Sequence, residues 1–414
     1  MAKTRVVVIG AGPAGIMSAG QAALCGAKVF LLEKGPIAAR KLRITGKGRC
    51  NITNTAELEK FIDAFEPNGR FLYGCLNRFS NNNLIAFINQ LGVNTKVERG
   101  GRVFPESDSA SEVAEAIIKW ALECGVSLKL NKRVKAIVCE ENKVIAVDTY
   151  SGRINCDAAV VATGGASYPK TGSDGDGYDI AAKLGHTITP IKPALSALIT
   201  KESWVSILEG ISLKNVIANL LIDDNKKPHA SEFGEMLFTN DGISGPIILT
   251  LSRKAGRLIE KHNVYISIDL KPALTEEQLH QRLISDFKQN IFFKNYIPSL
   301  LPKRFSSILP CLTNIEESRR INSITAEERK NIVSVLKGLK LQIKSLDPLE
   351  NAIVTSGGVN ISEIDPKTME SKIINGLFFA GEVIDIDAET GGYNLQAAFS
   401  TGYIAGISAA NLKK

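Results

Sequence analysis

The chain opens with a strand that runs directly into a glycine-rich turn, and this stretch constrains the fold more than any other. The β-branched residues of Val6–Ile9 predict a buried strand, and Gly10–Gly15 form the pattern G-x-G-x-x-G. A helical pattern follows and ends near Gly26, after which residues 28–33 predict a second strand with Glu33 at its end. Strand, turn, helix and strand in this order predict a βαβ unit that binds a dinucleotide.

Each glycine of this turn has a physical role in such a site. Gly10 allows the tight turn, Gly12 lets the backbone approach a pyrophosphate, and Gly15 lets the helix pack close to the strand. The helix N-terminus offers free N–H groups and positive charge to the phosphates. Glu33 can accept hydrogen bonds from ribose hydroxyls. The cofactor contacts predicted in this unit are Gly10, Ala11, Gly12, Pro13, Ala14, Gly15, Glu33 and Lys34.

Length and composition limit the class of protein. With 414 residues the chain is long for one core, which predicts two or three domains. It contains no apolar run long enough for a membrane span, and its first strand begins too early to leave room for a signal peptide. The seven cysteines are scattered, which predicts a cytoplasmic protein with neither a disulfide framework nor a metal site. The net charge of +7 would help to attract phosphorylated cofactors or, weakly, nucleic acid.

The order of elements predicts an α/β protein whose nucleotide domain is split in sequence. Residues 1–190 and 367–414 carry strand and helix patterns that end in glycine turns. Residues 191–272 and 337–366 are mostly short strands and turns, which predicts a β-rich insertion. Residues 273–336 are charged and helical in pattern, and we expect them to form a helical insertion.

Two further glycine turns distinguish the chain from a plain nicotinamide dehydrogenase. A buried strand ends in Ala162–Gly165, and a C-terminal strand ends in Gly381-Glu382. Gly391-Gly392 then opens a last helix that is rich in Ala and Gly. This arrangement resembles the glutathione-reductase-like FAD fold, in which the last helix aims its N-terminus at the flavin. Such a terminus stabilises an anion, here the reduced flavin, by about 0.3–1 kcal/mol or more when buried.

Several longer motifs are similar to those of the YhiN/BaiN-type flavoproteins. They are Gly46-Lys47-Gly48-Arg49-Cys50-Asn51-Ile52-Thr53-Asn54, Gly101–Pro105, Ala162–Gly172, Gly234–Thr239, Gly381–Asp385 and Thr390–Asn394. On this resemblance the chain is identified as a member of that family of bacterial NAD(P)/FAD-dependent, aminoacetone oxidase-like oxidoreductases. The resemblance implies a discontinuous FAD-binding Rossmann domain, an inserted β-barrel-like domain and a small helical domain. Lys47 departs from the family pattern, because many members have Gly there.

The resemblance extends the predicted FAD site beyond the first turn. In the basic, glycine-rich loop, the charges of Arg40, Lys41, Lys47 and Arg49 would neutralise phosphates or the reduced flavin. The cofactor contacts predicted in this loop are Lys41, Gly46, Lys47, Gly48, Arg49, Cys50 and Asn51. The other predicted contacts are Val134, Ala162, Thr163, Gly164, Gly165, Gly381, Glu382, Gly392, Tyr393, Asn394, Leu395 and Gln396. Because no second nucleotide fingerprint is visible, NAD(P)H would bind only transiently, at the flavin face.

Three residues are candidates for the chemistry itself. Tyr393 and Tyr168 are candidate proton donors for the reduction of a C=C or C=N bond, although tyrosines near a cofactor more often stack or pack. Cys50 would react only if Arg49 stabilised its thiolate, and a small buried packing residue is the favoured alternative. His186 is expected to be structural.

The predicted function is that of an FAD-dependent oxidoreductase. NAD(P)H or a substrate would reduce the flavin, which would pass hydride or electrons to a small organic molecule or to oxygen. The acidic strings 173–177 and 385–389 lack the spacing of a metal loop and predict turns and helix caps. Two alternatives stay open: an FAD-containing RNA-interacting protein, although the basic residues of 273–336 alternate with acids, and a non-catalytic flavin sensor. Nothing in the sequence predicts the oligomeric state.

Overall fold

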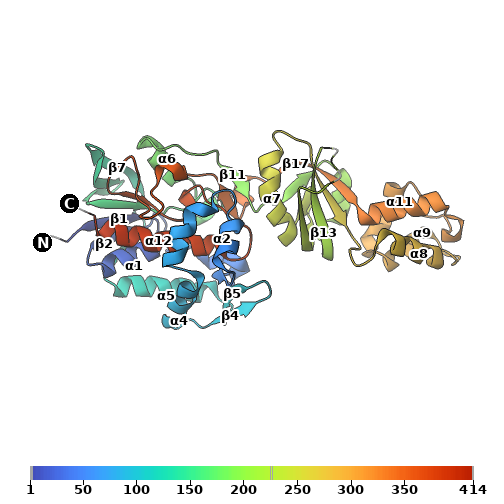
Figure 1. Cartoon of the computed structure of the whole chain (residues 1–414), viewed down its shortest axis with the longest axis horizontal. Coiled ribbons are helices and arrows are strands. Elements are labelled where there is room, and N and C mark those ends of the chain that lie inside the picture. Colours follow the sequence, from blue (N-terminus) through green and yellow to red (C-terminus); the bar gives the residue numbers. More distant parts are fainter. Residues whose placement is uncertain (1–2, 224, 226, 413–414) are drawn as a thin grey trace. The chain divides into compact units, whose positions relative to one another are not determined.

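The computed structural model of the protein describes residues 3–223, 225 and 227–412 and divides into two compact units (Figure 1). Unit 1 comprises Met1–Lys192 and Leu349–Lys414. Unit 2 comprises Pro193–Pro348. The predicted α/β class, with a Rossmann domain and an inserted barrel, is confirmed, as the following elements show.

Unit 1 is built around a five-stranded parallel sheet in the order β19–β10–β1–β2–β6. Two of the three inner strands, β1 and β10, are almost entirely buried, as expected for continuous apolar runs covered on both faces. The carboxyl ends of β1, β10 and β19 each lead into a glycine turn. The strands are β1 (Arg5–Ile9), β2 (Lys28–Leu32), β6 (Ser127–Lys129), β10 (Ala158–Val161) and β19 (Leu377–Phe379).

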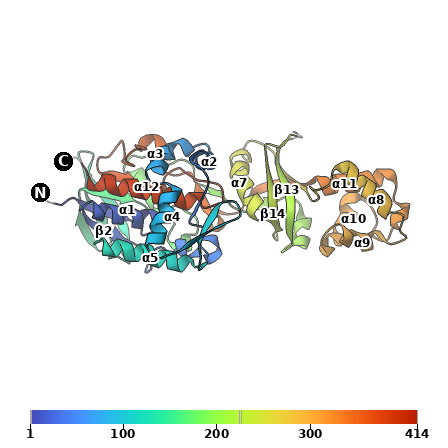
Figure 2. The ribbon, with the colours of Figure 1, turned by 60° about the horizontal axis from the view of Figure 1, so that its bottom comes forward.

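Two long helices of unit 1, α1 (Pro13–Leu24) and α12 (Tyr393–Ala410), lie side by side (Figures 1 and 2). A Cβ atom on Gly402 would lie 2.3 Å from the carbonyl oxygen of Ala14, and one on Gly406 would lie 2.2 Å from that of Ser18. Only glycine therefore allows this approach. From the first contact to the second, both helices continue by one turn toward their C-termini, so they run parallel. This close packing explains why α12 is rich in Ala and Gly.

Other helices and two small antiparallel sheets complete unit 1. The helices are α2 (Leu58–Ala64), α3 (Tyr73–Arg78), α4 (Asn81–Gln90), α5 (Ala110–Glu123) and α6 (Asp176–Lys183). One sheet joins β3 (Thr53–Asn54), β5 (Arg102–Pro105) and β4 (Thr95–Glu98). The other is a meander of β7 (Val134–Glu140), β8 (Lys143–Thr149) and β9 (Gly152–Asn155).

Unit 2 contains a closed antiparallel barrel in the order β12–β15–β14–β13–β16–β17. Alternate residues of its strands point into the core, as in Val264, Ile266 and Ile268. The strands are β12 (Leu198–Thr200), β13 (Ser212–Ile222), β14 (Ala230–Phe238), β15 (Gly242–Ser244), β16 (Val264–Asp269) and β17 (Leu339–Leu346), with α7 (Pro246–Leu258) beside them. The short strand β11 (Lys192–Ala194) precedes them in sequence.

The helical segment of unit 2 is more broken than its pattern predicts. Instead of one continuous helical stretch it forms α8 (Glu276–Asp286), α9 (Phe293–Tyr296), α10 (Leu309–Thr313) and α11 (Ala326–Lys337). Pro298, Pro302 and Pro310 lie in this stretch, and proline cannot continue a helix through its interior. Capping boxes at Thr275 and Thr325 start the two longer helices. Barrel and helices share one apolar core.

The segment 349–366 belongs to unit 1, whereas its pattern assigns it to the β-rich insertion. It contains one short strand, β18 (Val354–Ser356). The backbone of Val359 hydrogen-bonds to Val383 (2.9 Å) and Asp385 (3.0 Å), in the turn that follows β19. Long-range pairing of this kind, rather than the composition of the segment, decides where it packs.

Candidate functional site

The turn between β1 and α1 is packed so tightly that two of its glycines have no substitute. Gly10 has a φ of +99°, and a Cβ there would lie 2.5 Å from the carbonyl oxygen of Ala162. A Cβ on Gly15 would lie 1.9 Å from the carbonyl oxygen of Gly10. Gly12 differs, because a Cβ there would meet no atom within 4 Å. Gly12 is the N-cap of α1, and no side chain caps this helix, so its first N–H groups are available to an anion.

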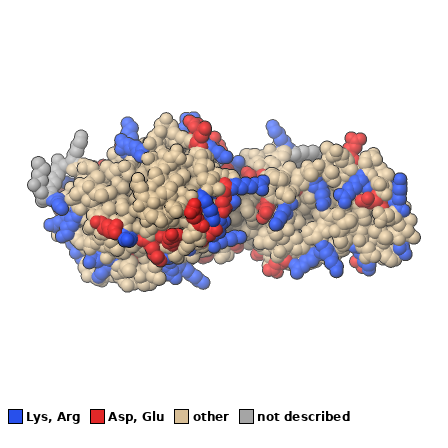
Figure 3. Space-filling view, turned by 90° about the horizontal axis from the view of Figure 1, so that it is seen from below, with Lys and Arg blue, Asp and Glu red and all other residues tan. Residues whose placement is uncertain are grey.

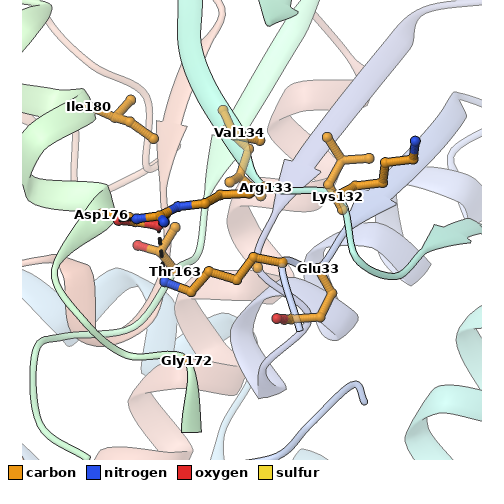
Figure 4. A pocket seen from close by; sticks show the side chains of 12 residues that line it. Glu33, Lys132, Arg133, Val134, Thr163, Gly172, Asp176 and Ile180 are labelled. Atoms are coloured by element: carbon orange, nitrogen blue, oxygen red, sulfur yellow. Dashed lines mark hydrogen bonds and ion pairs between the residues drawn. The ribbon is translucent and has the colours of Figure 1, made fainter. Parts of the chain in front are cut away.

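Beside this turn lies a hollow that is open to solvent (Figure 4). Ile9, Leu32 and Val134 line it from the ends of strands, Ile180 lines it from α6, and charged side chains surround them, an arrangement that suits a nucleoside. The carboxylate of Glu33 accepts hydrogen bonds from the N–H groups of Ala11 (3.0 Å) and Gly35 (2.8 Å). The lining residues are Ile9, Gly10, Leu32, Glu33, Lys34, Lys132, Arg133, Val134, Thr163, Gly172, Asp176 and Ile180.

An ion-pair network crosses one side of this hollow. Asp176, the first residue of α6, pairs with Lys34 (3.0 Å) and with Arg133 (2.7 Å), and Lys34 also pairs with Asp174. Burial opposes ionisation of Asp176, but the hydrogen bonds from Arg133 and Lys34 outweigh it and lower the pKa of the carboxyl group. The charge of Lys34 is thus neutralised locally. Sequence reasoning missed Arg133 and Asp176 as lining residues, because only the folded chain brings them together.

The second and third glycine turns meet at Glu382. Its carboxylate accepts hydrogen bonds from the Nζ of Lys41 (2.8 Å), the hydroxyl of Ser167 (3.3 Å) and the backbone N–H of Thr355 (2.8 Å). Lys41 also donates to Ser167 (2.8 Å). A Cβ on Gly165 would lie 2.4 Å from the hydroxyl oxygen of Thr355, so this turn too requires glycine. The structure therefore brings together three of the predicted segments.

The basic loop winds through several left-handed residues. Its 3-10 segment Leu42–Gly48 contains Lys47, which is exposed and has a φ of 59°. The guanidinium group of Arg49 pairs with Glu98 and Asp108, and it stacks over the ring of Phe104 at 4.3 Å. The side chain of Arg49 is therefore held against the sheet that contains β4 and β5, where the two carboxylates neutralise its charge.

The environment of Cys50 argues against a reactive thiolate. Its side chain is completely buried, and burial raises the pKa of the thiol to about 12, against a smaller opposing effect of a hydrogen bond with Thr45. Its neighbour Arg49 is held by the two carboxylates named above. The packing role, which the sequence already favours, is the one that these surroundings support.

The two candidate tyrosines differ in their surroundings. Tyr393 is the first residue of α12, is 5% exposed, and packs edge-on against the ring of Phe61 at 4.9 Å. Burial, aided by the charge of Glu389, raises the pKa of its phenol, so it keeps its proton at neutral pH. Tyr168 is half-buried and has a left-handed backbone with a φ of 54°.

The other predicted residues of α12 play different parts. Leu395 is partly buried against the core of unit 1. The amide of Asn394 bonds to both the N–H (2.9 Å) and the carbonyl (3.1 Å) of Ala388, which closes the preceding loop. Gln396 is completely buried, and both ends of its amide are engaged by protein groups. The side chains of Asn394 and Gln396 thus bond to other protein groups. The first turn of α12 has no side-chain cap.

A Ser–His–Glu arrangement, which the sequence did not reveal, lies outside this region. His186 contacts Glu363 through Nδ1 (3.1 Å) and the hydroxyl of Ser371 through Nε2 (2.9 Å). Ser371 is only 6% exposed, and its oxygen accepts hydrogen bonds from the N–H groups of Ile373 and Ile374. A buried oxygen with its lone pairs so occupied is no nucleophile. The arrangement agrees with the structural role predicted for His186.

His186 should make the protein less stable as the pH falls below about 6.5, the ordinary histidine pKa. In the native protein burial lowers the pKa of His186, although Glu363 opposes this shift. Below pH 6.5 the unfolded chain therefore binds a proton that the native protein excludes. The free energy of unfolding should fall by up to about 1.4 kcal/mol per pH unit until the native pKa is reached, and His186 should contribute no slope above pH 6.5.

Urea unfolding at several pH values between 5 and 8 would measure this slope. His186→Gln should flatten it relative to the wild type, whereas the exposed His229→Gln should leave it unchanged. Identical slopes in all three proteins would contradict the assignment.

Within residues 3–223, 225 and 227–412, no three His, Cys, Asp or Glu side chains lie together in a way that could hold a metal ion. None of the helices in the described part of the chain combines the length and the apolar character needed to cross a membrane.

Comparison with known proteins places this geometry in a family. The model of the HI0933-like protein Rossmann domain matches residues 4–408. A 3-dehydro-bile acid delta(4,6)-reductase from Clostridium scindens is 31% identical, and the match covers 98% of this chain and 99% of that protein. A ribosomal RNA dihydrouridine synthase from Haemophilus influenzae is 30% identical over 97% of each protein. A flavocytochrome c3 fumarate reductase in its open conformation has a similar fold, with a TM-score of 0.53, 18% identity and coverage of 98% of this chain and 78% of that one.

The residues present fit the cofactor of such a fold. Space is open at Gly12, two helices begin without side-chain caps, and Glu33 lines the hollow beside the first turn. The resemblance to the YhiN/BaiN-type flavoproteins is confirmed over almost the whole chain. The chain therefore belongs to the HI0933-like family and is an FAD-dependent oxidoreductase.

Proposed function

We propose that the protein reduces a C=C bond that is conjugated to a carbonyl group, and that its substrate is a small organic molecule. The bile-acid relative is named for reduction of the delta(4,6) system of a 3-oxo substrate, and the ribosomal RNA relatives are named for making dihydrouridine from uridine. Both reactions add two hydrogens across a C=C bond in conjugation with a carbonyl. This shared chemistry supports the same reaction class here.

The FAD site that we propose follows the glycine turns of unit 1. The N-terminus of α1, with Gly10–Gly15, would hold the pyrophosphate, and the hollow at Glu33 and Val134 would hold the adenosine. The remaining contacts would come from the backbone of three segments, 46–51, 162–165 and 381–382, and from the uncapped N-terminus of α12. The single observation that carries this assignment is the open space at Gly12 beside the free N–H groups of α1.

The chain must also supply a proton, because bound FAD would supply only hydride. We propose Tyr393 as the donor, with Tyr168 as the second candidate. The raised pKa of Tyr393 keeps its phenol protonated at neutral pH, and its position at the start of α12 places it beside the proposed cofactor site. Cys50, with a thiol pKa of about 12 and no exposed surface, is a poorer donor.

Uridine within RNA is the second candidate substrate, because the relatives from Haemophilus influenzae and Escherichia coli carry that name. The basic residues of the helical segment give it little support. Arg319 pairs with Glu328, and Arg320 binds the carbonyl of Asn290 and stacks over Phe292 at 3.9 Å. On the face drawn in Figure 3, Lys and Arg side chains are interspersed with Asp and Glu. These contacts describe an ordinary charged surface rather than a phosphate-binding strip.

We further propose that NAD(P)H reduces the flavin and that the protein works in the cytoplasm. The seven cysteines are all unpaired, which suits a reducing compartment. NAD(P)H is the common soluble hydride donor there, and it would bind transiently in the same region as the substrate.

An anaerobic visible spectrum would test this function. The purified protein should be yellow, and its oxidised-flavin band should bleach on addition of NADPH or NADH. A steroidal 4-en-3-one should then restore the band faster than buffer does, and a uridine-containing RNA should not. If only the RNA restored the flavin band, RNA would be the substrate and not a small molecule. If neither acceptor restored the band, the proposed reaction would be contradicted.

A further inference from the structure

We propose that the side chains of residues 51–54 act as a clamp that positions the N-terminus of α12, rather than as cofactor contacts. The clamp consists of the side chains of Asn51, Thr53 and Asn54 together with their partner Gln396 on α12. The proposal rests on the FAD site described above. It deepens that site, because it gives the end of the motif Gly46–Asn54 a role in positioning α12, the helix that is proposed to face the flavin.

Two asparagines of the clamp hold the glycines that precede α12. Asn54, only 3% exposed, donates from its amide to the carbonyl of Gly391 (3.0 Å) and to that of Gly100 (3.0 Å). The surroundings of Asn51 orient its amide so that the oxygen accepts from the N–H of Gly392 (3.0 Å) while the nitrogen donates to backbone carbonyls. The peptide group that joins the two glycines is thus held at both its carbonyl and its N–H.

The third contact lies one turn inside the helix. Thr53 donates its hydroxyl to the amide oxygen of Gln396 (2.7 Å), and both side chains are completely buried. The nitrogen of the same amide donates to the carbonyl of Phe79 (3.1 Å) and to the hydroxyl of Ser400 (3.0 Å). A buried network with every member satisfied holds one arrangement firmly, because any other leaves a polar group unpaired.

Backbone geometry gives a reason for the close contact. Gly392 has a φ of +99°, and a Cβ there would lie 2.4 Å from the carbonyl oxygen of Thr53. β3 therefore lies directly against the start of α12, which only glycine permits. The clamp grips the helix through residues 391, 392 and 396, and no side chain caps its first turn. The N–H groups of that turn stay available to a ligand while their direction is fixed.

A fixed helix N-terminus should favour the reduced, anionic flavin over the oxidised, neutral one. Preorganised dipoles stabilise a developing charge without reorganisation, and the size of this effect depends on how directly the dipoles point at the charge. Loosening the clamp should therefore weaken binding of reduced FAD more than binding of oxidised FAD. The ratio of the two affinities sets the reduction potential of the bound flavin, and a merely structural network would leave that ratio unchanged.

Thr53→Val and Gln396→Met remove the hydrogen bonds of the clamp without adding charge. In each flavin-loaded variant the affinity ratio should fall about tenfold, which is about 30 mV more negative for a two-electron couple. Anaerobic dye titration would measure the potential, and thermal unfolding of the apo-protein would measure stability. Ser400→Ala is the matched control, because it cuts the same network one turn further along α12 and should lower stability without moving the potential.

The outcomes separate the clamp from the proposed function. If both clamp variants keep the potential of the Ser400→Ala protein, the network is only structural and the proposal is overturned. If Gln396→Met fails to fold, the milder Thr53→Val decides the question. A wild-type protein that binds no FAD would overturn the proposed cofactor site itself, whereas normal FAD binding with an unchanged potential in the variants overturns the clamp alone.

Discussion

Gly12→Asp should abolish FAD binding and leave the fold intact. The backbone at Gly12 is extended, with a φ of −81°, and a side chain there meets no atom within 4 Å. Aspartate is also a favourable helix N-cap, so α1 should lose nothing. Its carboxylate would however stand where the pyrophosphate is expected. Repulsion between unit charges about 4 Å apart near a protein surface is about 4 kcal/mol, which corresponds to a loss of roughly 1,000-fold in affinity.

The ratio of flavin absorbance to protein absorbance after purification measures this effect, and the melting temperature of the apo-protein monitors the fold. Gly12→Ala is the matched control, because it adds a Cβ without a charge and should lose less flavin than the aspartate variant. Full flavin occupancy in the aspartate variant would place the pyrophosphate elsewhere. Loss of flavin together with a lower apo-protein melting temperature would show that the variant acts through the fold.

Local sequence signals predict the parts of the site that depend on backbone conformation. Gly10 and Gly15 can be identified from spacing alone, since the turn that they allow is formed by neighbours in sequence. The same holds for Gly392, which opens a helix and takes a left-handed conformation. For these glycines, the atoms that exclude a side chain lie either a few residues away in the chain or in another segment that has a recognisable sequence motif.

Side-chain roles are harder to predict, because they depend on partners far away in sequence. Arg49 lies in a basic loop and suggests a cofactor contact, yet Glu98 and Asp108 neutralise it. The pairing of Lys34 with Asp176 joins residues 142 positions apart, so nothing near either residue announces it. Gln396 illustrates the same limit, since its partners Thr53 and Phe79 reach it only through the packing of α12.

The second large effect is expected for Glu382→Ala, which should lower the free energy of unfolding by about 2–3 kcal/mol. Its carboxylate is the common acceptor for Lys41, Ser167 and Thr355, which lie in three separate segments. The side chains of Lys41 and Glu382 are 22% and 21% exposed, so solvent screens their interaction only in part. Removal of one partner leaves a half-buried cation and a backbone N–H without an acceptor, which costs more than the net contribution of the pair.

Urea unfolding of the apo-protein, with a double-mutant cycle, would separate these contributions. Glu382→Gln keeps an acceptor oxygen for Thr355 but loses the charge, so it should cost less than alanine. In the cycle with Lys41→Met, a coupling energy of about 1 kcal/mol or more would identify the ion pair itself as stabilising. A change within about 0.5 kcal/mol for Glu382→Ala, the range of ordinary surface substitutions, would show that the three segments are held together without this carboxylate.

The same variant should also retain less flavin, because the turn after β10 and the turn after β19 would no longer be fixed to each other.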